Sequence, residues 1–136
     1  MTKEQIKTGD APPPGGAYSQ AIRSGGFLFI SGQTPRDLSR ELVNGSLEDQ
    51  ARKAFSNLEA VAKAGGGSLA DAVQVTVYLR DFANFDVMDR VFADFFPEPR
   101  PARTTIQSDI PVEVEVDALL HVGDREGRSG EGEFGE

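Results

Sequence analysis

The sequence predicts an α+β fold in which one β-sheet carries two helices on the same face. Apolar residues recur at helical spacing over residues 46–64 and 82–96, which predicts two amphipathic helices. They alternate with polar residues over residues 72–79 and 112–122, which is typical of half-buried strands. Because 136 residues are enough for one hydrophobic core and too few for two ordinary ones, we expect one domain over residues 1–122.

The first part of the chain leads into a predicted β-hairpin. Residues 1–16 are polar and include three consecutive prolines, which favour an extended lead-in. Residues 17–23 and 27–31 are two short runs joined by a Ser-Gly-Gly turn, a pattern typical of a hairpin with glycines at positive φ. Residues 32–45 have no clear periodicity, so we expect a loop that arches over the sheet.

Ser46 begins the first predicted helix. With Asp49 three residues later it forms an approximate capping box, and Gly65-Gly66-Gly67 ends the helix. The clearest strand pattern follows at residues 72–79. One face of this strand is predicted to carry Val73, Val75, Val77 and Leu79.

The second predicted helix, residues 82–96, ends at two nearby prolines. Its apolar stripe, which we interpret as core packing, consists of Phe85, Met88, Phe92 and Phe95. Strands are predicted over residues 103–107 and 112–122. Residues 123–136 form an acidic, Gly-rich tail with one large hydrophobic side chain, so we expect this tail to be disordered.

Composition narrows the possible chemistry. The chain has no cysteine, which excludes disulfides, thiolate nucleophiles and zinc–thiolate sites. Its only histidine, His121, is not part of a zinc-deaminase motif. We therefore expect neither a metal nor a cofactor. The net charge of -8 argues against a nucleic-acid partner. Without a long apolar run or a signal-peptide pattern, we expect no membrane partner and a cytoplasmic location.

Five segments, in this order along the chain, resemble the signature segments of the RidA/YjgF family. They are GAYSQA at residues 16–21, ISGQTP at 30–35, VTVYLRD at 75–81, PARTT at 101–105 and VEVDA at 114–118.

The resemblance spans about residues 11–122 and implies both a fold and an activity. The implied fold is a six-stranded mixed sheet with two helices on one face, similar to the trimeric chorismate mutases. It implies a homotrimer with ligand clefts between subunits. It also implies a metal- and cofactor-independent hydrolase of the 2-iminobutanoate/2-iminopropanoate deaminase type, which converts enamines and imines of 2-amino acids to 2-keto acids and ammonia.

The resemblance assigns the catalytic roles to Arg103 and Glu115. A guanidinium offers a planar fork to the two oxygens of a substrate carboxylate, which suits Arg103. Without the motif, a surface or interface salt bridge is the commoner fate of an arginine. Glu115 is the acid implied to orient or activate the hydrolytic water. Asp117 lies two residues further along the same strand face. We interpret it as part of a solvated acidic surface and not as a catalytic group.

Other substrate-binding positions follow from the same resemblance. Tyr18 is implied to line the pocket, Ser31 and Gly32 to contact the ligand near its carboxylate, and Thr105 to offer its backbone N–H. Asp89 stands where well-known deaminases have Asn. Its charge disfavours a carboxylate ligand unless Asp89 points away or pairs with Arg90 or Arg100. The loop between Arg103 and Glu115 is also shorter than in those relatives.

Two other functions fit the same motifs. A trimer of this kind could bind 2-keto acids or related metabolites without catalysis and act as a sensor. Some relatives carry the label of a ribonuclease or translation inhibitor, which the acidic charge disfavours here.

Overall fold

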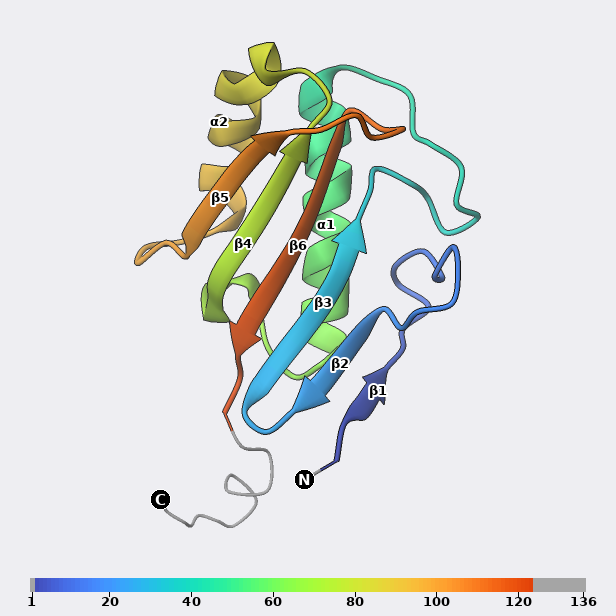
Figure 1. Cartoon of the computed structure of the whole chain (residues 1–136), viewed down its shortest axis with the longest axis vertical. Helices are drawn as coiled ribbons and strands as arrows, with labels where there is room; N and C mark the ends of the chain where they lie inside the picture. Colours follow the sequence, from blue (N-terminus) through green and yellow to red (C-terminus); the bar gives the residue numbers. More distant parts are fainter. Residues whose placement is uncertain (1, 124–136) are drawn as a thin grey trace.

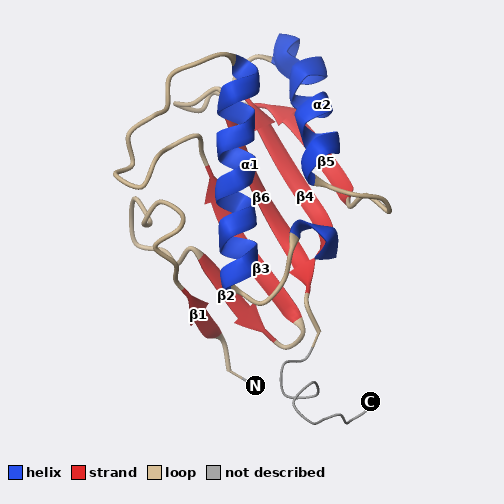
Figure 2. Cartoon of the chain, turned by 180° about the vertical axis from the view of Figure 1, so that it is seen from behind, coloured by secondary structure: helices blue, strands red, loops and turns tan. Residues whose placement is uncertain are grey.

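A computed structural model describes residues 2–123. Six strands form one sheet in the order β1-β2-β3-β6-β4-β5, and two helices form a second layer on one of its faces (Figures 1 and 2). The strands are β1 (Glu4–Ile6), β2 (Ala21–Ser24), β3 (Phe27–Gln33), β4 (Ala72–Leu79), β5 (Ala102–Gln107) and β6 (Val114–His121). The helices are α1 (Leu47–Ala64) and α2 (Phe85–Phe95), with 3-10 turns η1 (Leu69–Asp71) and η2 (Phe82–Asn84). This arrangement confirms the predicted α+β fold.

The sheet is mixed because one pair of its strands is parallel. β4 pairs with β5 in parallel, and the chain passes from one to the other through α2 on the helical face. Every other pair is antiparallel. The last strand, β6, lies between β3 and β4 and so joins the amino-terminal hairpin to the rest of the sheet (Figure 1).

Local chemistry fixes the ends of α1 as predicted. The Ser46 side chain accepts from the Asp49 backbone N–H, and the Asp49 carboxylate accepts from the Ser46 N–H, each at 3.2 Å. At the other end the N–H of Gly65 donates to backbone carbonyls of the last turn. Gly25 takes a φ of 61° in the turn between β2 and β3, so one of the two glycines of the Ser-Gly-Gly turn has the positive φ predicted for it.

The core lies between the helices and the sheet. Phe55 of α1 meets Phe92 of α2 edge to face, with ring centroids 5.8 Å apart, and Phe96 stacks on Phe92 at 4.2 Å. Alternate residues of β6 are buried beneath the helices, namely Val114, Val116, Ala118 and Leu120. The residues between them, which include Glu115 and Asp117, therefore face the open side of the sheet.

The structure departs from the sequence prediction in three places. Residues 4–6 form the edge strand β1, where an extended lead-in was expected. The hairpin's first strand begins at Ala21, four residues later than predicted. Val73 is 44% exposed, so its predicted place on the buried face is wrong, because the register between β4 and β6 shifts between Ala72 and Gln74.

The predicted tail falls almost wholly beyond the described part of the chain. Of residues 123–136 only Gly123 is described, and its N–H donates to the carbonyl of Gly26 at 3.2 Å. Within residues 2–123, neither helix is both long and apolar enough to cross a bilayer.

Candidate functional site

Arg103 and Glu115, the two residues predicted to carry catalysis, lie on opposite faces of the same sheet. Arg103 is opposite Val75 in the β4–β5 ladder, and Val75 is buried beneath the helices. Glu115 is opposite Tyr78 in the β4–β6 ladder, three residues further along β4. Because side chains alternate between faces along a strand, Arg103 points to the helical side and Glu115 to the open side. One copy of the chain therefore does not bring the two together.

Arg103 is held against α2 of its own chain. Its Nη1 lies 2.8 Å from Oδ1 of Asp89, and its guanidinium carbon lies 4.5 Å from the ring centroid of Phe92 and 5.4 Å from that of Phe85. The side chain is 18% exposed. The aromatic rings and the carboxylate fix the position of the guanidinium, which still reaches the surface.

Asp89, predicted as a substrate-binding position, lies next to Arg103. Within the described residues its carboxylate pairs with Arg103, and not with Arg90 or Arg100, the two partners that would have kept its charge away from a carboxylate ligand. Arg100 instead donates to the carboxylate of Glu98 at 3.1 Å. Asp89 thus sits beside the residue expected to hold a ligand carboxylate.

Thr105 lies on the same face of β5 as Arg103, two residues further along. β5 is an edge strand that pairs only with β4, so alternate backbone N–H groups of β5 point away from the sheet. This placement is compatible with the predicted role of the Thr105 backbone beside Arg103.

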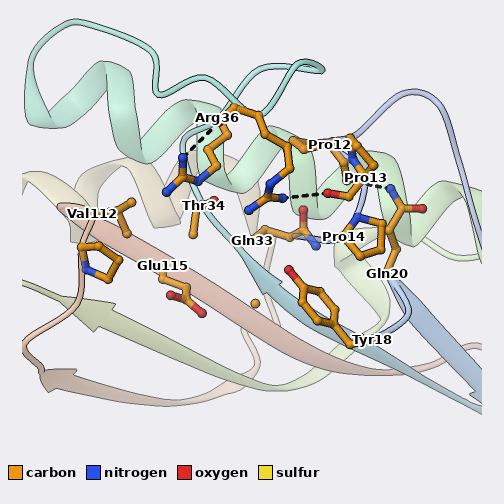
Figure 3. A pocket seen from close by; sticks show the side chains of 13 residues that line it. Pro12, Pro13, Pro14, Tyr18, Gln20, Gln33, Thr34, Arg36, Val112 and Glu115 are labelled. Atoms are coloured by element: carbon orange, nitrogen blue, oxygen red, sulfur yellow. Dashed lines mark hydrogen bonds between the residues drawn. The ribbon is translucent and has the colours of Figure 1, made fainter. Parts of the chain in front are cut away.

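Glu115 lies in a pocket of about 210 Å³ at the end of β3, on the open side of the sheet (Figure 3). The carboxylate faces the hollow from one side, and the ring of Tyr18 faces it from another (Figure 3). The complete lining is Pro12, Pro13, Pro14, Tyr18, Gln20, Gly32, Gln33, Thr34, Arg36, Arg40, Pro111, Val112 and Glu115. The pocket therefore unites three of the predicted residues: Glu115, Tyr18 and Gly32.

Gly32 makes room for the Glu115 carboxylate. A Cβ at position 32 would overlap Oε2 of Glu115, so a larger residue would force the carboxylate to move. The register between β3 and β6 shifts between Ile30 and Gln33, which places Gly32 at this point. The absence of a side chain at position 32 thus leaves the space that the Glu115 carboxylate occupies.

The surroundings of Glu115 in the protein favour the neutral carboxylic acid over the charged carboxylate, compared with the same group in water. Burial, and secondly the negative charge of Asp117, raise the pKa of the Glu115 carboxyl above its usual range. Asp117 itself accepts a hydrogen bond of 2.9 Å from the Tyr78 hydroxyl. Asp117 lines a neighbouring hollow and not the Glu115 pocket. The two acids are therefore in different surroundings, and Glu115 is the one that faces the pocket.

Tyr18 and Ser31 lie at the boundary of the two hollows. Tyr18 lines both, and its hydroxyl oxygen accepts from the N–H of Gly15 at 2.9 Å. Ser31 lines only the neighbouring hollow, where its hydroxyl donates to the carbonyl of Ser19 at 2.7 Å. The structure therefore brings Tyr18, but not Ser31, to the Glu115 pocket.

One buried side chain, Gln20, holds the proline-rich wall of the pocket. Its Nε2 donates to the carbonyls of Thr8 at 3.1 Å and Pro12 at 2.9 Å, and its Oε1 accepts from the Thr8 N–H at 2.7 Å. Gln20 is 4% exposed, so these bonds satisfy an amide that water hardly reaches. These hydrogen bonds hold the proline-rich wall in place, although its residues 12–14 form neither a helix nor a strand.

Sequence reasoning missed two cationic residues of the pocket, Arg36 and Arg40. Both come from the loop between β3 and α1, which was expected only to arch over the sheet. The sequence indicated a cationic pocket in one way only, by placing two arginines within eight residues of Gly32 in an acidic chain. Among residues 2–123, no group of three or more His, Cys, Asp or Glu side chains is placed to hold a metal ion.

Comparison with known sequences finds a family and several relatives. The family model described as Endoribonuclease L-PSP matches residues 8–122. A RutC family protein of Pyrococcus horikoshii is 45% identical over 123 residues, which covers 88% of this chain and 98% of the relative. A protein of Dermatophagoides farinae named 2-iminobutanoate/2-iminopropanoate deaminase is 36% identical over 122 residues, covering 87% and 95%.

Comparison with solved structures gives the same family. The structure of RidA from an Antarctic Psychrobacter species superposes with a TM-score of 0.83 at 38% identity. The match covers 88% of this chain and 99% of that protein. The six-stranded mixed sheet with two helices is thus shared across almost the full length of this relative.

Proposed function

The chain belongs to the RidA/YjgF family, and from this premise we propose that it is an imine deaminase, a hydrolase that converts 2-iminobutanoate, 2-iminopropanoate and similar 2-imino acids to 2-keto acids and ammonia. The observation that carries the proposal is the half-buried carboxylate of Glu115 in a pocket with Tyr18 and Gly32. A relative named as this deaminase adds support.

The reaction is a hydrolysis with no change in oxidation state. Water adds to the carbon of the C=N bond, so a C–O bond forms and the nitrogen takes up a proton. The C–N bond of the resulting carbinolamine then breaks, the hydroxyl proton leaves, and ammonia departs from the new 2-keto acid. Such imines also hydrolyse in water, so positioning and one proton relay, worth about 10²–10⁴-fold, suffice for useful acceleration.

In this proposal Glu115 carries the proton. As a carboxylate it accepts a proton from the attacking water, and as a carboxylic acid it returns a proton to the departing nitrogen. A pKa raised by burial and by Asp117 brings these two forms closer in population near neutral pH. Tyr18, whose ring faces the same hollow, would close the pocket over the imine.

We further propose that three copies assemble and that Arg103 of one copy faces the Glu115 pocket of another. Arg103 and Glu115 point to opposite sides of one sheet, so a shared site needs a second copy. The open face also carries large exposed apolar side chains, including Phe29 at 49% exposure. In this arrangement Arg103 binds the substrate carboxylate, assisted by the Thr105 backbone and next to Asp89.

The test is hydrolysis of a freshly generated imine. An amino-acid oxidase acting on 2-aminobutanoate supplies 2-iminobutanoate, and the release of 2-oxobutanoate is followed with and without the protein. We expect Glu115→Gln and Arg103→Ala each to lower the rate at least a hundredfold. Glu113→Gln is the matched control, because Glu113 pairs with Arg80 outside the pocket.

The outcome separates the enzyme from its main alternative. If the protein binds 2-oxobutanoate but does not accelerate hydrolysis, the sensor function replaces the enzymatic one. Full activity in Glu115→Gln would move catalysis away from this pocket.

A further inference from the structure

We propose that Arg36 and Arg40 bind a second carboxylate on the substrate, so that 2-imino dicarboxylic acids are the preferred substrate class. The inference rests on the proposed function, because both arginines line the pocket that contains Glu115. Figure 3 shows the guanidinium of Arg36 on the side of the hollow away from Tyr18. The reaction itself is unchanged, and only the side chain of the substrate differs.

The two arginines have no carboxylate partner within the described residues. Four other arginines of residues 2–123 do form ion pairs with Asp or Glu, namely Arg52, Arg80, Arg100 and Arg103. In contrast, Nη1 of Arg36 donates to the Arg40 carbonyl at 3.0 Å, and Nη1 of Arg40 donates to the Pro13 carbonyl at 2.7 Å. Carbonyl partners leave the positive charge of each guanidinium unneutralised.

Arg36 also has an unsatisfied donor. Its Nε is buried and has no hydrogen-bond partner among residues 2–123. Buried donors without partners are rare because each one loses its bonds to water without replacement. An arginine binds a carboxylate through two adjacent N–H groups, often Nε and one Nη. A ligand carboxylate that the guanidinium turns to meet would therefore supply the missing acceptor.

The backbone that carries these arginines is fixed by the fold. Nδ2 of the buried Asn57 in α1 donates to the carbonyls of Thr34 and Arg36, each at 2.9 Å. Arg40 takes a φ of 66°, and its guanidinium lies so close to Gly15 that a Cβ there would be 2.6 Å from Nη2. The arginines thus belong to a built wall of the pocket.

Charge in the pocket favours a dianionic ligand. Its charged lining residues are Arg36, Arg40 and Glu115, which give two positive charges against one carboxylate, itself with a raised pKa. In the proposed assembly Arg103 holds the carboxylate next to the imine. A substrate with an apolar side chain would then cover two guanidinium groups without pairing them, which is unfavourable.

The first experiment measures binding of two stable product analogues to the full chain by calorimetry. 2-Oxoglutarate carries the second carboxylate, and 2-oxobutanoate lacks it. We expect the dicarboxylate to bind about tenfold more tightly. This preference, expressed as the ratio of the two Kd values, should be lost in Arg36→Gln. It should stay within twofold of wild type in Arg52→Gln, a control arginine on the exposed face of α1.

The second experiment compares hydrolysis of the imines of glutamate and 2-aminobutanoate, each generated by an oxidase. A higher kcat/KM for the dicarboxylic imine, reduced in Arg36→Gln, supports the inference. Equal rates for both imines in the wild type would refute the inference and leave the deaminase function intact. If neither imine is hydrolysed, the proposed function fails and the substrate class fails with it, whereas the binding ratio still shows whether Arg36 recognises a second carboxylate. Arg40→Gln serves as the second variant if Arg36→Gln does not fold.

Discussion

The carboxylate of Asp89 lies 2.8 Å from the guanidinium of Arg103, so the side chain proposed to hold the substrate is already ion-paired within its own chain. A ligand carboxylate must share or displace this partner. The Asp89 side chain is 52% exposed, which weakens the pair through solvent screening. We therefore expect the ion pair to weaken ligand binding by Arg103 without preventing it.

We expect Asp89→Asn to bind 2-oxobutanoate about three- to tenfold more tightly than the wild type. The amide keeps the size of the side chain and removes the negative charge that opposes the ligand. Calorimetric titration of both proteins measures the change. Asp86→Asn, three residues earlier on α2 and without a described ion pair, controls for the loss of one charge. Weaker binding in Asp89→Asn would show that Asp89 serves mainly to hold Arg103 in place.

We expect Gly32→Ala to lower kcat for imine hydrolysis at least tenfold while the protein stays folded. The new Cβ would overlap Oε2 of Glu115 and push the carboxylate from its place in the pocket. Gly9→Ala is the control, because a Cβ at Gly9 has no atom within 4 Å. Steady-state kinetics and thermal unfolding of both variants are the measurements. An unchanged kcat in Gly32→Ala would mean that the position of Glu115 is not critical.

We expect Glu115→Gln to stabilise the fold at pH 7 but not at pH 3. The folded-state pKa of Glu115 is raised, so the ionised carboxylate opposes folding once the pH exceeds the unfolded-state pKa. Below that pKa the group is neutral in both states, and the opposition disappears. Because the carboxyl is only half-buried, the gain at pH 7 should be about 0.5 kcal/mol. Urea unfolding at the two pH values measures it, with Glu41→Gln as an exposed control.

We expect the wild-type chain to sediment as a trimer and Phe29→Glu to sediment as a smaller species. Phe29 is 49% exposed on the open face of the sheet, where a charge would be buried on assembly. Leu38→Glu, an exposed apolar residue of the loop before α1, should remain trimeric. A monomeric wild type at micromolar concentration would contradict both the assembly and the shared site.

Elements with strong periodicity could be predicted from the sequence, whereas irregular ones could not. The capping residues Ser46 and Asp49 and the alternation in β6 located their elements to within about two residues. β1 has only three residues and one buried side chain, Ile6, so it carries no usable pattern. Val73 was misplaced because one extra residue in a strand shifts the side chains before it to the other face.

The site was predicted in its residue types and only partly in its geometry. The motifs led to Glu115, Tyr18 and Gly32, which share one pocket. The pairing of Asp89 with Arg103 depends on how α2 packs on β5, which neither segment reveals by itself. The arginines of the pocket were missed because a loop without periodicity gives no indication of where its side chains point.

Gln20 shows how this pocket can vary while the sheet stays the same. A single amide, bonded to Thr8 and Pro12, ties an irregular segment to the start of β2. Substitutions in that segment can reshape the entrance, provided that its carbonyls still reach the amide. The proposed selectivity for imines can therefore change among related chains at little cost to folding, because Pro12, Pro13 and Pro14 of this wall lie outside the hydrophobic core.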